Sequence, residues 1–519
     1  MRLIVVANRL SLVIKKEQDK FVYKQSSGGL ATGLKCVKND MDFIWIGNVT
    51  GIKEEDRKEV EETCWSNYKA VPVFVDKQLN QDSYNLYCNN ILWPLLHSFD
   101  NLINNESKFQ AYKEYNKLFC DRILEVAEEN DVIWVHDYHL MLLPKMIKER
   151  KNVKVAFFLH TPFPSGEVFC NLPNSKDILK GLLLADKIGF HLPEYKSQFI
   201  DACKTCLSIN DFIKNKEGNQ SLPTNAAKET NQKNNSNKPM KQVNKSTNEV
   251  KEKSDDSLKV TKLCDSNFYN TVKGIRYSPS CIETFKKVSL SSIPIGIDPN
   301  MFREVLKKDK VQKRINELKN IFKNKKVILG VDRTDYIKGM PHRMKCYEKY
   351  LSKYKNNSTV YIQIAVPSRM DLFEYNKLVT DIKLYSTGIN NDTGINNNKV
   401  LLYNKSVDFD ELCALYSLAD ALLITSLRDG MNLVALEYIA CQENKKGVLI
   451  LSKFAGAVDT LPGCITVNPW SFEEVADKIN GALSMNENEK SRRYSINKIN
   501  IDKFTAVNWA KKNLEVLFK

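Results

Sequence analysis

The sequence predicts an α/β protein made of two doubly wound domains, because runs typical of buried strands alternate with helix-like stretches in two consecutive sets. Short segments rich in Val, Ile and Phe are typical of strands that a parallel sheet buries on both faces. In chain order these segments are LIVVA, FIWIG, VIWV and VAFFL, then VILGV, VYIQIAV, VLLY, ALLITS and GVLILS. We expect a ligand site in the cleft that the two domains share.

Length and composition agree with more than one domain. The chain has 519 residues, 43% of them hydrophobic, and a domain usually takes roughly 100 to 200 residues. Between about 214 and 257 the composition shifts to Asn, Lys, Ser, Thr and Glu. Such a segment buries too little apolar surface to offset its ordering entropy, so we predict a disordered insertion. The Asn-rich stretch at 390–398 is predicted to be another loop, and the terminal NWAKKNLEVLF a packed helix.

The net charge of the chain is +15, from 77 basic and 62 acidic side chains. This excess favours anionic partners such as phosphorylated metabolites, nucleic acid or acidic lipid, and a solvated basic surface without a partner is the alternative. Nucleic acid is disfavoured because no basic motif interleaved with aromatic residues appears.

The sequence gives no support for export or membrane insertion. The first apolar run stops after about five residues at Asn8 and Arg9, whereas a signal peptide needs roughly 7 to 15. No run approaches the roughly 18 apolar residues of a membrane helix. We therefore expect a cytoplasmic protein without membrane contact.

The cysteines are expected to be reduced. Thirteen of them are scattered over the chain, which is an odd number and does not suggest a disulfide framework. Cys203 and Cys206 have the CxxC spacing of zinc and redox motifs, but the surrounding FIDACKTCL favours ordinary helix.

Polar and charged residues follow most of the predicted strands. Ligands of a parallel α/β sheet bind beyond the carboxyl ends of its strands, so these residues are candidates for a site. They are Asn8 and Arg9, His136 and Asp137, His160, Asp332 and Arg333, Ser368 and Arg369, and Arg428 and Asp429. A single residue of this kind is a weak signal, because a polar residue is needed wherever a strand emerges into solvent. Six sets together indicate a site.

Three of these residues are arginines, which suit phosphate because the planar guanidinium makes paired, charge-assisted hydrogen bonds. They are Arg9, Arg333 and Arg369, and Lys338 adds a compact cation five residues after Arg333. Pairing with surface carboxylates is the alternative role for each.

Two further patterns are weaker. Gly28 and Gly29 precede a helix-like stretch, where backbone amides can approach a diphosphate, although a simple capping turn has the same residues. Asp408 and Asp410 form a DxD pattern of the metal-binding kind, but a helical pattern follows them, so we interpret them as a helix N-cap. A metal is not required where two fixed cations and a helix N-terminus face the diphosphate.

Longer strings give a more specific signal. VIWVHDYHL at 132–140, FFLHTPFPSGEVF at 157–169 and LRDGMNLVALEY at 427–438 resemble signatures of the trehalose-6-phosphate synthase family, glycosyltransferase family 20. ANRL, YCNNILWPLLH, IPIGID, DRTDYIKGMPHR and LSKFAGA are similar to it as well. The resemblance spans nearly the whole chain, in order, outside the Asn/Lys-rich insertion.

The resemblance implies a GT-B fold, in which two Rossmann-like domains face each other across a cleft. An acceptor-binding domain would span 1–298 and a nucleotide-sugar domain 299–495, with a helix at 496–519 packing back on the first. The implied reaction moves glucose from UDP-glucose to glucose 6-phosphate with retention at C1 and without a metal or other cofactor. A separate trehalose-phosphate phosphatase would act on the product, and assembly into a homo-oligomer is left open.

Carried over position by position, the resemblance implies contacts to each part of the two substrates. The acceptor's 6-phosphate would be held by Arg9, Tyr84, Trp93 and Arg369. The donor's diphosphate would meet Arg333, Lys338, Gly28 and Gly29, and its ribose Glu437, with backbone groups of Asn432, Leu433 and Val434 lining the site. The transferred glucose would contact Asp137, His160, Asp429 and the turn at Met431 and Asn432.

The predicted mechanism places fixed cations on the leaving group. Breaking the bond between glucose C1 and the diphosphate leaves negative charge on the diphosphate, so Arg333 and Lys338 would lower the barrier. The diphosphate can itself accept the acceptor's proton, so Asp137 and His160 are assigned to binding and charge stabilisation. Hydrolysis between two carboxyl groups, here Asp137 and Asp429, is the competing reaction.

Two departures from the family pattern motivate other functions. Asn48 in WIGNVTG stands where the family usually has Trp, and the stretch between Asp381 and Val400 lacks the usual sequence. A regulatory subunit that binds sugar phosphate without turnover is therefore the second hypothesis. A related transferase with another donor or acceptor is the third.

Overall fold

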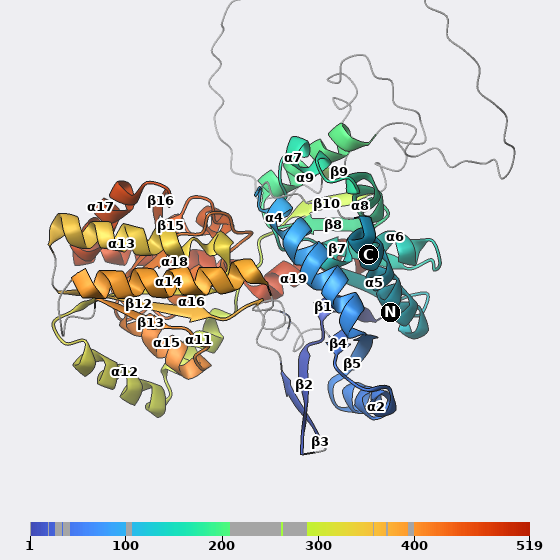
Figure 1. Ribbon diagram of the computed structural model, residues 1–519, viewed down its shortest axis with the longest axis horizontal. Coiled ribbons are helices and arrows are strands. Elements are labelled where there is room, and N and C mark those ends of the chain that lie inside the picture. Colours follow the sequence, from blue (N-terminus) through green and yellow to red (C-terminus); the bar gives the residue numbers. More distant parts are fainter. Residues whose placement is uncertain are drawn as a thin grey trace, which may run out of the picture.

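The computed structural model describes residues 2–18, 20–25, 34, 42–99, 106–207, 261–262, 288–355, 358–369, 372–392 and 399–518. These residues form two lobes, each built around one sheet, with the N-terminal lobe on the right of Figure 1 and the C-terminal lobe on the left. The predicted turn at Gly28 and Gly29 and the predicted insertion at 214–257 lie outside the described residues.

The first lobe contains an eight-stranded sheet in the order β5-β4-β1-β6-β7-β8-β10-β9. Neighbouring strands are parallel except for β10 and β9. The strands are β1 (Leu3–Arg9), β4 (Phe43–Thr50), β5 (Ala70–Val75), β6 (Val132–His136), β7 (Lys154–Phe158), β8 (Lys187–Phe190), β9 (Thr261–Lys262) and β10 (Ser289–Ser292). An antiparallel hairpin of β2 (Leu12–Glu17) and β3 (Lys20–Gln25) projects at the bottom of this lobe (Figure 1).

The second lobe contains a six-stranded, parallel sheet in the order β13-β12-β11-β14-β15-β16. Its strands are β11 (Lys326–Arg333), β12 (Thr359–Val366), β13 (Val400–Tyr403), β14 (Ala421–Ile424), β15 (Val448–Ser452) and β16 (Ile465–Val467). This is the strand order of a doubly wound nucleotide-binding domain. The predicted α/β class is confirmed, and each predicted strand segment overlaps a strand. No strand was predicted at β2, β3, β5, β8, β9, β10 or β16. In β10 the reason is its SLSS sequence, which has a single large apolar residue.

Helices flank both sheets. In the first lobe they are η1 (Glu54–Asp56), α2 (Arg57–Tyr68), α3 (Lys77–Asn80), η2 (Gln81–Leu92), α4 (Trp93–Leu96), α5 (Glu106–Val126), η3 (Tyr138–Leu140), α6 (Leu143–Lys148), α7 (Gly166–Cys170), α8 (Ser175–Leu182) and α9 (Pro193–Cys206). From residue 299 on they are α11 (Pro299–Leu306), α12 (Asp309–Ile321), η6 (Tyr336–Lys338), α13 (Met340–Tyr354), α14 (Phe373–Asp392), α15 (Phe409–Leu418), α16 (Leu433–Ala440), η7 (Gly456–Thr460), α17 (Phe472–Leu483), α18 (Glu487–Lys503) and α19 (Ala506–Phe518).

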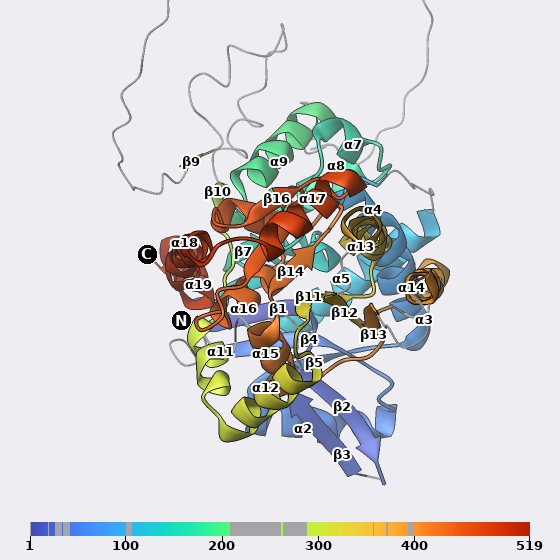
Figure 2. The ribbon, with the colours of Figure 1, turned by 90° about the vertical axis from the view of Figure 1, so that its left-hand side faces the viewer.

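Both faces of the second sheet are buried, as its nearly unbroken apolar strands predict. Figure 2 looks onto this lobe and shows α13, α14 and α17 on one side of the sheet and α11, α12 and α15 on the other. Neighbouring residues of β11 alternate between these two sides of the sheet. Ile328 belongs to the core on the side of α13, α14 and α17, and Leu329 to the core on the side of α11, α12 and α15.

The terminal helix α19 packs on the first sheet rather than on the second lobe that precedes it. Its Trp509 ring lies 4.8 Å from the ring of Trp134 and 5.0 Å from that of Phe158. The ammonium groups of Lys154 and Lys187 donate hydrogen bonds to backbone carbonyls of α19. The predicted terminal helix is therefore confirmed, and it returns to the first lobe.

One loop prediction is partly wrong, because α14 continues through Asp392 into the Asn-rich stretch. The Asn390 side chain gives the reason. Its Oδ1 accepts hydrogen bonds from the backbone N–H groups of Lys399 and Val400, and its Nδ2 donates to the Val400 carbonyl, all at 2.9 Å. Asparagine is typical of loops, but here Asn390 ties the end of α14 to the start of β13.

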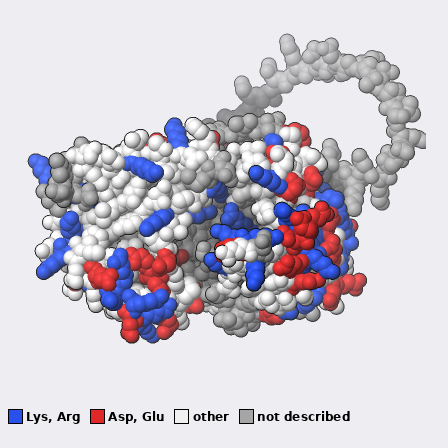
Figure 3. All heavy atoms as spheres, turned by 60° about the horizontal axis from the view of Figure 1, so that its bottom comes forward, with Lys and Arg blue, Asp and Glu red and all other residues white. Residues whose placement is uncertain are grey.

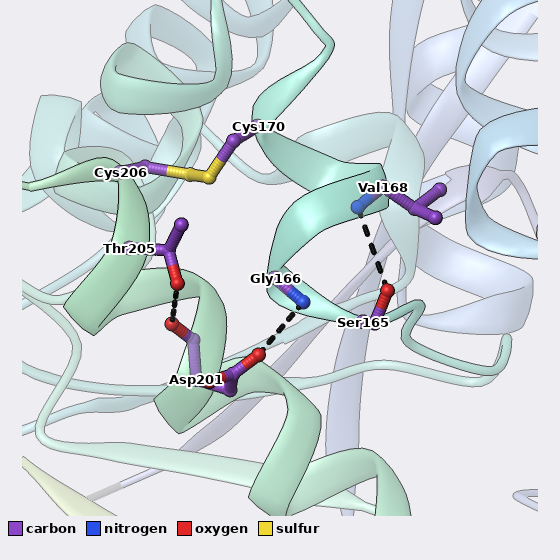
Figure 4. Close-up of a disulfide and its surroundings, with 7 residues drawn as sticks. All are labelled: Ser165, Gly166, Val168, Cys170, Asp201, Thr205 and Cys206. Atoms are coloured by element: carbon purple, nitrogen blue, oxygen red, sulfur yellow. Dashed lines mark hydrogen bonds between the residues drawn. A yellow bond between two sulfur atoms is a disulfide. The ribbon is translucent and has the colours of Figure 1, made fainter.

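The prediction of reduced cysteines is wrong for one pair. Cys170 at the end of α7 and Cys206 at the end of α9 form a disulfide (Figure 4). Their Cα atoms lie 5.6 Å apart because α7 packs beside α9, where Asp201 accepts a hydrogen bond from the Gly166 amide at 3.0 Å. Cys203, the other half of the CxxC pattern, is free and buried on ordinary helix. The pairing crosses 36 residues, so spacing along the sequence carried no signal for it.

Charged side chains of both signs lie in patches on the surface seen in Figure 3, between broad areas without charge, and basic side chains gather near the middle of that face. The net charge of +15 therefore coexists with many acidic groups on the same face. Within the described residues, no helix combines the length and the apolar content needed to cross a bilayer.

The packing of α19 generates a stability prediction. We expect Trp509→Ala to lower the free energy of unfolding by about 3 to 5 kcal/mol, because a large buried ring is replaced by a cavity. Urea unfolding followed by fluorescence measures the loss. The matched control is Trp470→Ala, since that side chain is 58% exposed, and we expect a change within about 0.5 kcal/mol. Equal midpoints for the two variants would contradict the packing.

Candidate active site

Four of the charged residues predicted from strand ends follow the strands at which each sheet reverses its order. The reversal falls between β1 and β6 in the first sheet and between β11 and β14 in the second. Doubly wound sheets bind ligands at this point, outside the carboxyl ends of the strands. Arg9 ends β1, Asp137 follows β6, Arg333 ends β11 and Asp429 lies beyond β14.

The four residues predicted to hold the acceptor phosphate form two contacting pairs. Arg9 donates from Nη2 to the Tyr84 hydroxyl at 3.2 Å. The guanidinium carbon of Arg369 lies 4.2 Å from the centre of the Trp93 ring, a cation–π contact. Burial alone would raise the pKa of Tyr84, but the charges of Arg9, Arg369 and Arg333 lower it. The two pairs and Arg333 therefore share one electropositive neighbourhood.

A π-helix explains how Tyr84 and Trp93 both come to lie near Arg369, whose charge lowers the pKa of Tyr84 and whose guanidinium lies over the Trp93 ring. Tyr84 lies on the π-helical segment η2, and Trp93 begins α4 directly after it. Nine residues are two and a half turns of an α-helix, which would place the two rings on opposite faces. The wider turn of a π-helix changes this spacing, and such turns are frequent at functional sites.

Arg369 is held in one orientation by its neighbours. Its backbone φ is +51°, a strained value for a residue with a side chain. Nη1 donates to Asp335 Oδ2 at 3.1 Å and to the Tyr375 hydroxyl at 2.5 Å, and Nη2 donates to the Tyr138 hydroxyl at 3.3 Å. Its Nε is buried and has no hydrogen-bond partner among the described residues. The guanidinium is thus fixed before any ligand binds.

Lys338 ends η6, the short helix after β11. Asp335 caps this helix, because its Oδ1 accepts the Ile337 amide at 3.3 Å. Gly339 follows with φ of +62°, and a Cβ at this position would clash with the carbonyl of Thr425. A glycine is therefore required where the loop turns into α13.

Behind this loop lies Arg343, a fully buried guanidinium with a complete set of partners. It donates to Asp332 at 2.6 Å, to Gln363 at 3.0 Å and to Thr425 at 3.0 Å. A longer contact of 3.4 Å reaches the carbonyl of Lys338. These partners come from two neighbouring strands, β11 and β12, from the residue after β14 and from the Lys338 loop, so one side chain ties these parts of the sheet together.

Lys338 and Asp429 form a close ion pair, with 2.5 Å between Nζ and Oδ2. The same carboxylate oxygen accepts from Ser426 Oγ at 3.1 Å and from Asn432 Nδ2 at 2.9 Å. Burial alone would raise the pKa of Asp429, but Lys338 and Asn432 lower it. The cation predicted for the diphosphate therefore lies against the carboxylate predicted for the glucose.

The turn at residues 431–434, predicted to line the donor site, leads into α16. Asn432 is in the left-handed region with φ of +69°, and its side chain caps the helix. The first amides of a helix carry partial positive charge and suit an anion. Glu437 lies about one turn further along α16 and accepts a hydrogen bond from the Tyr416 hydroxyl at 2.9 Å. Burial raises the pKa of Glu437.

Asp137 and His160 lie together on the first lobe. Asp137 has φ of +75° and ψ of 167°, a region that side chains seldom allow. Its Oδ1 accepts the backbone N–H of His160 at 3.2 Å, and burial raises the pKa of Asp137 to about 6. The Nε2 of His160 lies 3.1 Å from the Nδ1 of His136. Burial lowers the pKa of His160, which keeps the imidazole neutral at physiological pH.

The two lobes touch next to these residues. The Tyr195 hydroxyl of the first lobe donates to the backbone carbonyl of Asp429 at 3.3 Å. A Cβ on Gly430 would clash with the carbonyl of His160, so a glycine lets the two chains approach. The residues predicted to bind the transferred sugar therefore meet from both sheets.

The full chain, residues 1–519, matches the family model of glycosyltransferase family 20. The chain belongs to glycosyltransferase family 20. The alpha,alpha-trehalose-phosphate synthase [UDP-forming] of Encephalitozoon cuniculi is 40% identical over 525 residues, covering 100% of this chain and 98% of the relative.

Solved structures show the same fold. A trehalose-6-phosphate structure from E. coli bound with UDP-2-fluoro glucose matches with a TM-score of 0.77 and 26% identity, over 100% of this chain and 99% of that one. An alpha,alpha-trehalose-phosphate synthase (UDP-forming) from Burkholderia xenovorans, in complex with glucose-6-phosphate, matches with a TM-score of 0.76 and 23% identity over the whole of both chains. The predicted GT-B fold is confirmed. The domain boundaries and the roles of single residues stay predictions.

Asn48, which departs from the family 20 pattern, has a place in this fold. It donates a hydrogen bond to the Tyr115 hydroxyl, which in turn donates to Asn8 Oδ1 at 2.6 Å. The Asn48 carbonyl accepts the Leu10 amide at 3.2 Å. Asn48 therefore braces the end of β1 on both sides of Arg9.

Sequence reasoning missed several polar neighbours of the site. Asp335 and Arg343 lie in the string DRTDYIKGMPHR, where only Arg333 and Lys338 received roles. The signal that could have identified Asp335 and Arg343 was their charge within a motif that leads from a strand into a helix. Tyr138 and Tyr375 gave no signal, because a tyrosine on a helix reads equally well as core.

The DxD pattern caps a helix, as predicted. Asp408 Oδ1 accepts the Glu411 amide at 2.8 Å at the start of α15. Asp410 pairs with Lys308 and Lys310. Over the described ranges of the chain, no group of three His, Cys, Asp or Glu side chains is arranged to hold a metal ion.

The raised pKa of Asp137 generates a prediction with a definite sign. Its folded-state pKa of about 6 lies above the ordinary 3.8, so the native state binds more protons than the unfolded state between these values. Stability from this group is therefore lost as pH rises through that window. We expect Asp137→Asn to unfold at higher urea than wild type at pH 7, by up to about 3 kcal/mol, and to match it near pH 3.

The contrasting control is Asp131→Asn. Burial would raise the pKa of Asp131, but hydrogen bonds from Arg2 and the Glu128 amide lower it. That substitution should destabilise the protein at pH 7. A loss of stability at pH 7 for Asp137→Asn as well would contradict the raised pKa.

Proposed function

We propose that this chain transfers glucose from UDP-glucose to glucose 6-phosphate with retention at C1, giving α,α-trehalose 6-phosphate and UDP. The observation that carries the proposal is the gathering of Arg9, Tyr84, Trp93 and Arg369 beside Arg333, with the Lys338 loop next to them. The names of the family 20 relatives support the reaction, since they are called UDP-forming trehalose-phosphate synthases.

The acceptor phosphate fits the two arginine pairs. Arg369 is buried and oriented by Asp335, Tyr375 and Tyr138. Arg9 is exposed, and its side chain donates a hydrogen bond to the Tyr84 hydroxyl. One fixed and one adjustable guanidinium can enclose a phosphate from two sides. The Burkholderia xenovorans relative was solved in complex with glucose-6-phosphate, which agrees with this assignment.

The donor diphosphate fits Arg333, Lys338 and the start of α16. Arg333 is exposed at the end of β11, so its guanidinium is available to a ligand. Lys338 already has Asp429 as a partner, and a diphosphate would share its ammonium group. The E. coli structure with UDP-2-fluoro glucose supports a nucleotide sugar in this fold.

Departure of the diphosphate leaves positive character on the sugar and negative charge on UDP. Fixed cations at the diphosphate stabilise the second charge in the transition state. The bond from C1 to the leaving oxygen breaks, the acceptor hydroxyl bonds to C1 on the same face, and the acceptor's proton passes to the departing diphosphate. Asp137, His160 and Asp429 then bind sugar hydroxyls and stabilise the developing positive charge. In this mechanism the protein supplies the cations itself, so we propose no metal or other cofactor.

The reaction leaves the phosphate ester of the acceptor intact. A separate phosphatase that acts on the product is therefore part of the proposal, together with a cytoplasmic location. The second hypothesis, a regulatory subunit without turnover, rests on Asn48, the altered stretch between Asp381 and Val400 and the Asn/Lys-rich insertion. The contact of Asn48 with Tyr115 gives a structural reason for the first of these.

The decisive assay mixes purified protein with UDP-glucose and glucose 6-phosphate and follows UDP release and trehalose 6-phosphate. We expect Arg333→Ala to lower kcat about 100-fold or more, since it removes a charge that stabilises the leaving group. The matched control is Arg314→Ala, an arginine on α12 that pairs with Glu411, and it should keep wild-type activity. Absence of transfer in wild type, or equal activity in the two variants, would reject the proposal.

A further inference from the structure

Asp335 is a fully buried carboxylate with three donors from three parts of the chain. Its Oδ1 accepts from Trp93 Nε1 at 3.4 Å and from the Ile337 amide at 3.3 Å. Its Oδ2 accepts from Arg369 Nη1 at 3.1 Å. A buried carboxylate is stable only when it is paired and hydrogen-bonded. Moving one of the three donors away from Asp335 therefore costs free energy, because it leaves a buried charge without that partner.

Two of the three donors belong to the proposed acceptor site. The Arg369 guanidinium lies over the Trp93 ring, and Asp335 holds both. Trp93 comes from the first lobe and Arg369 from the second. Asp335 therefore joins the two walls of the acceptor site.

The third donor belongs to the loop of the proposed donor site. Ile337, which donates this amide, is the second residue of η6, and Lys338 follows it. The Lys338 amide donates to the Asp335 carbonyl at 3.1 Å, so the loop closes back on Asp335 by backbone as well. The position of the Lys338 ammonium group thus depends on how Asp335 is held.

We propose that Asp335 is a positioning residue that couples the acceptor site to the donor site. This inference rests on the proposed function. An acceptor phosphate bound between the fixed Arg369 of the second lobe and Arg9 of the first holds Trp93 against Asp335, which steadies the Lys338 loop. The diphosphate then meets a loop that is already ordered, so each substrate strengthens the binding of the other by the same factor.

Calorimetry of UDP binding, with and without saturating glucose 6-phosphate, measures this coupling as a ratio of two Kd values. For wild type we expect UDP to bind about 5-fold or more tightly in the presence of glucose 6-phosphate. For Asp335→Asn we expect a ratio near one, because a neutral amide no longer holds the Arg369 charge. If Asp335 had a merely structural role, the substitution would raise both Kd values and leave their ratio unchanged.

The matched control is Asp408→Asn, which makes the same chemical change at a helix cap away from the site and should keep the wild-type ratio. Trp93→Phe keeps the ring and removes one donor to Asp335, so it should lower the ratio even if Asp335→Asn folds poorly. A wild-type ratio of one, or an unchanged ratio in both Asp335→Asn and Trp93→Phe, would overturn the inference. Failure of wild type to bind UDP or glucose 6-phosphate at all would instead overturn the proposed function, and this inference with it.

Discussion

A carboxylate buried away from water must find a cation, and this constraint organises the edge of the second sheet. Asp332, Asp335 and Asp429 are all buried there, and each has its own cation, namely Arg343, Arg369 and Lys338. Ionised groups in the interior are stable only when they are paired and hydrogen-bonded. The pairs therefore fix three loops at once, and with them the charges that face the first lobe.

The first lobe provides the exception. Asp137 is buried as well, yet it has backbone amides rather than a close cation as partners, and its pKa is raised to about 6. Its backbone is also strained. Strain and an uncompensated charge at one residue are typical of a functional site rather than of a structural one. In the proposed reaction the missing positive partner is supplied by the sugar, which gains positive character as the diphosphate leaves.

Much of this arrangement was predictable from the sequence, because strand ends and arginine chemistry are local signals. LIVVA and VILGV marked their strands, and the residues that follow them, Arg9 and Arg333, do lie at the carboxyl edges of the two sheets. The GT-B fold followed from the resemblance of longer strings. Trp93 and Arg369 were assigned to one ligand before any contact between them was known, and they are in contact.

The parts that escaped prediction depend on contacts across long stretches of chain. The disulfide between Cys170 and Cys206 needs the packing of α7 on α9. The role of Asn390 as a clamp on β13 needs the end of α14 to be placed in space. Asp335 lay inside a quoted motif, but its three partners come from positions 93, 337 and 369. No local pattern brings those positions together.

A crystal structure of the protein with UDP bound would show which charges meet the diphosphate. We expect diphosphate oxygens within hydrogen-bond distance of both Lys338 Nζ and the Arg333 guanidinium, at the start of α16. UDP bound elsewhere, or bound here with Lys338 still on Asp429 alone and Arg333 turned to solvent, would contradict this expectation.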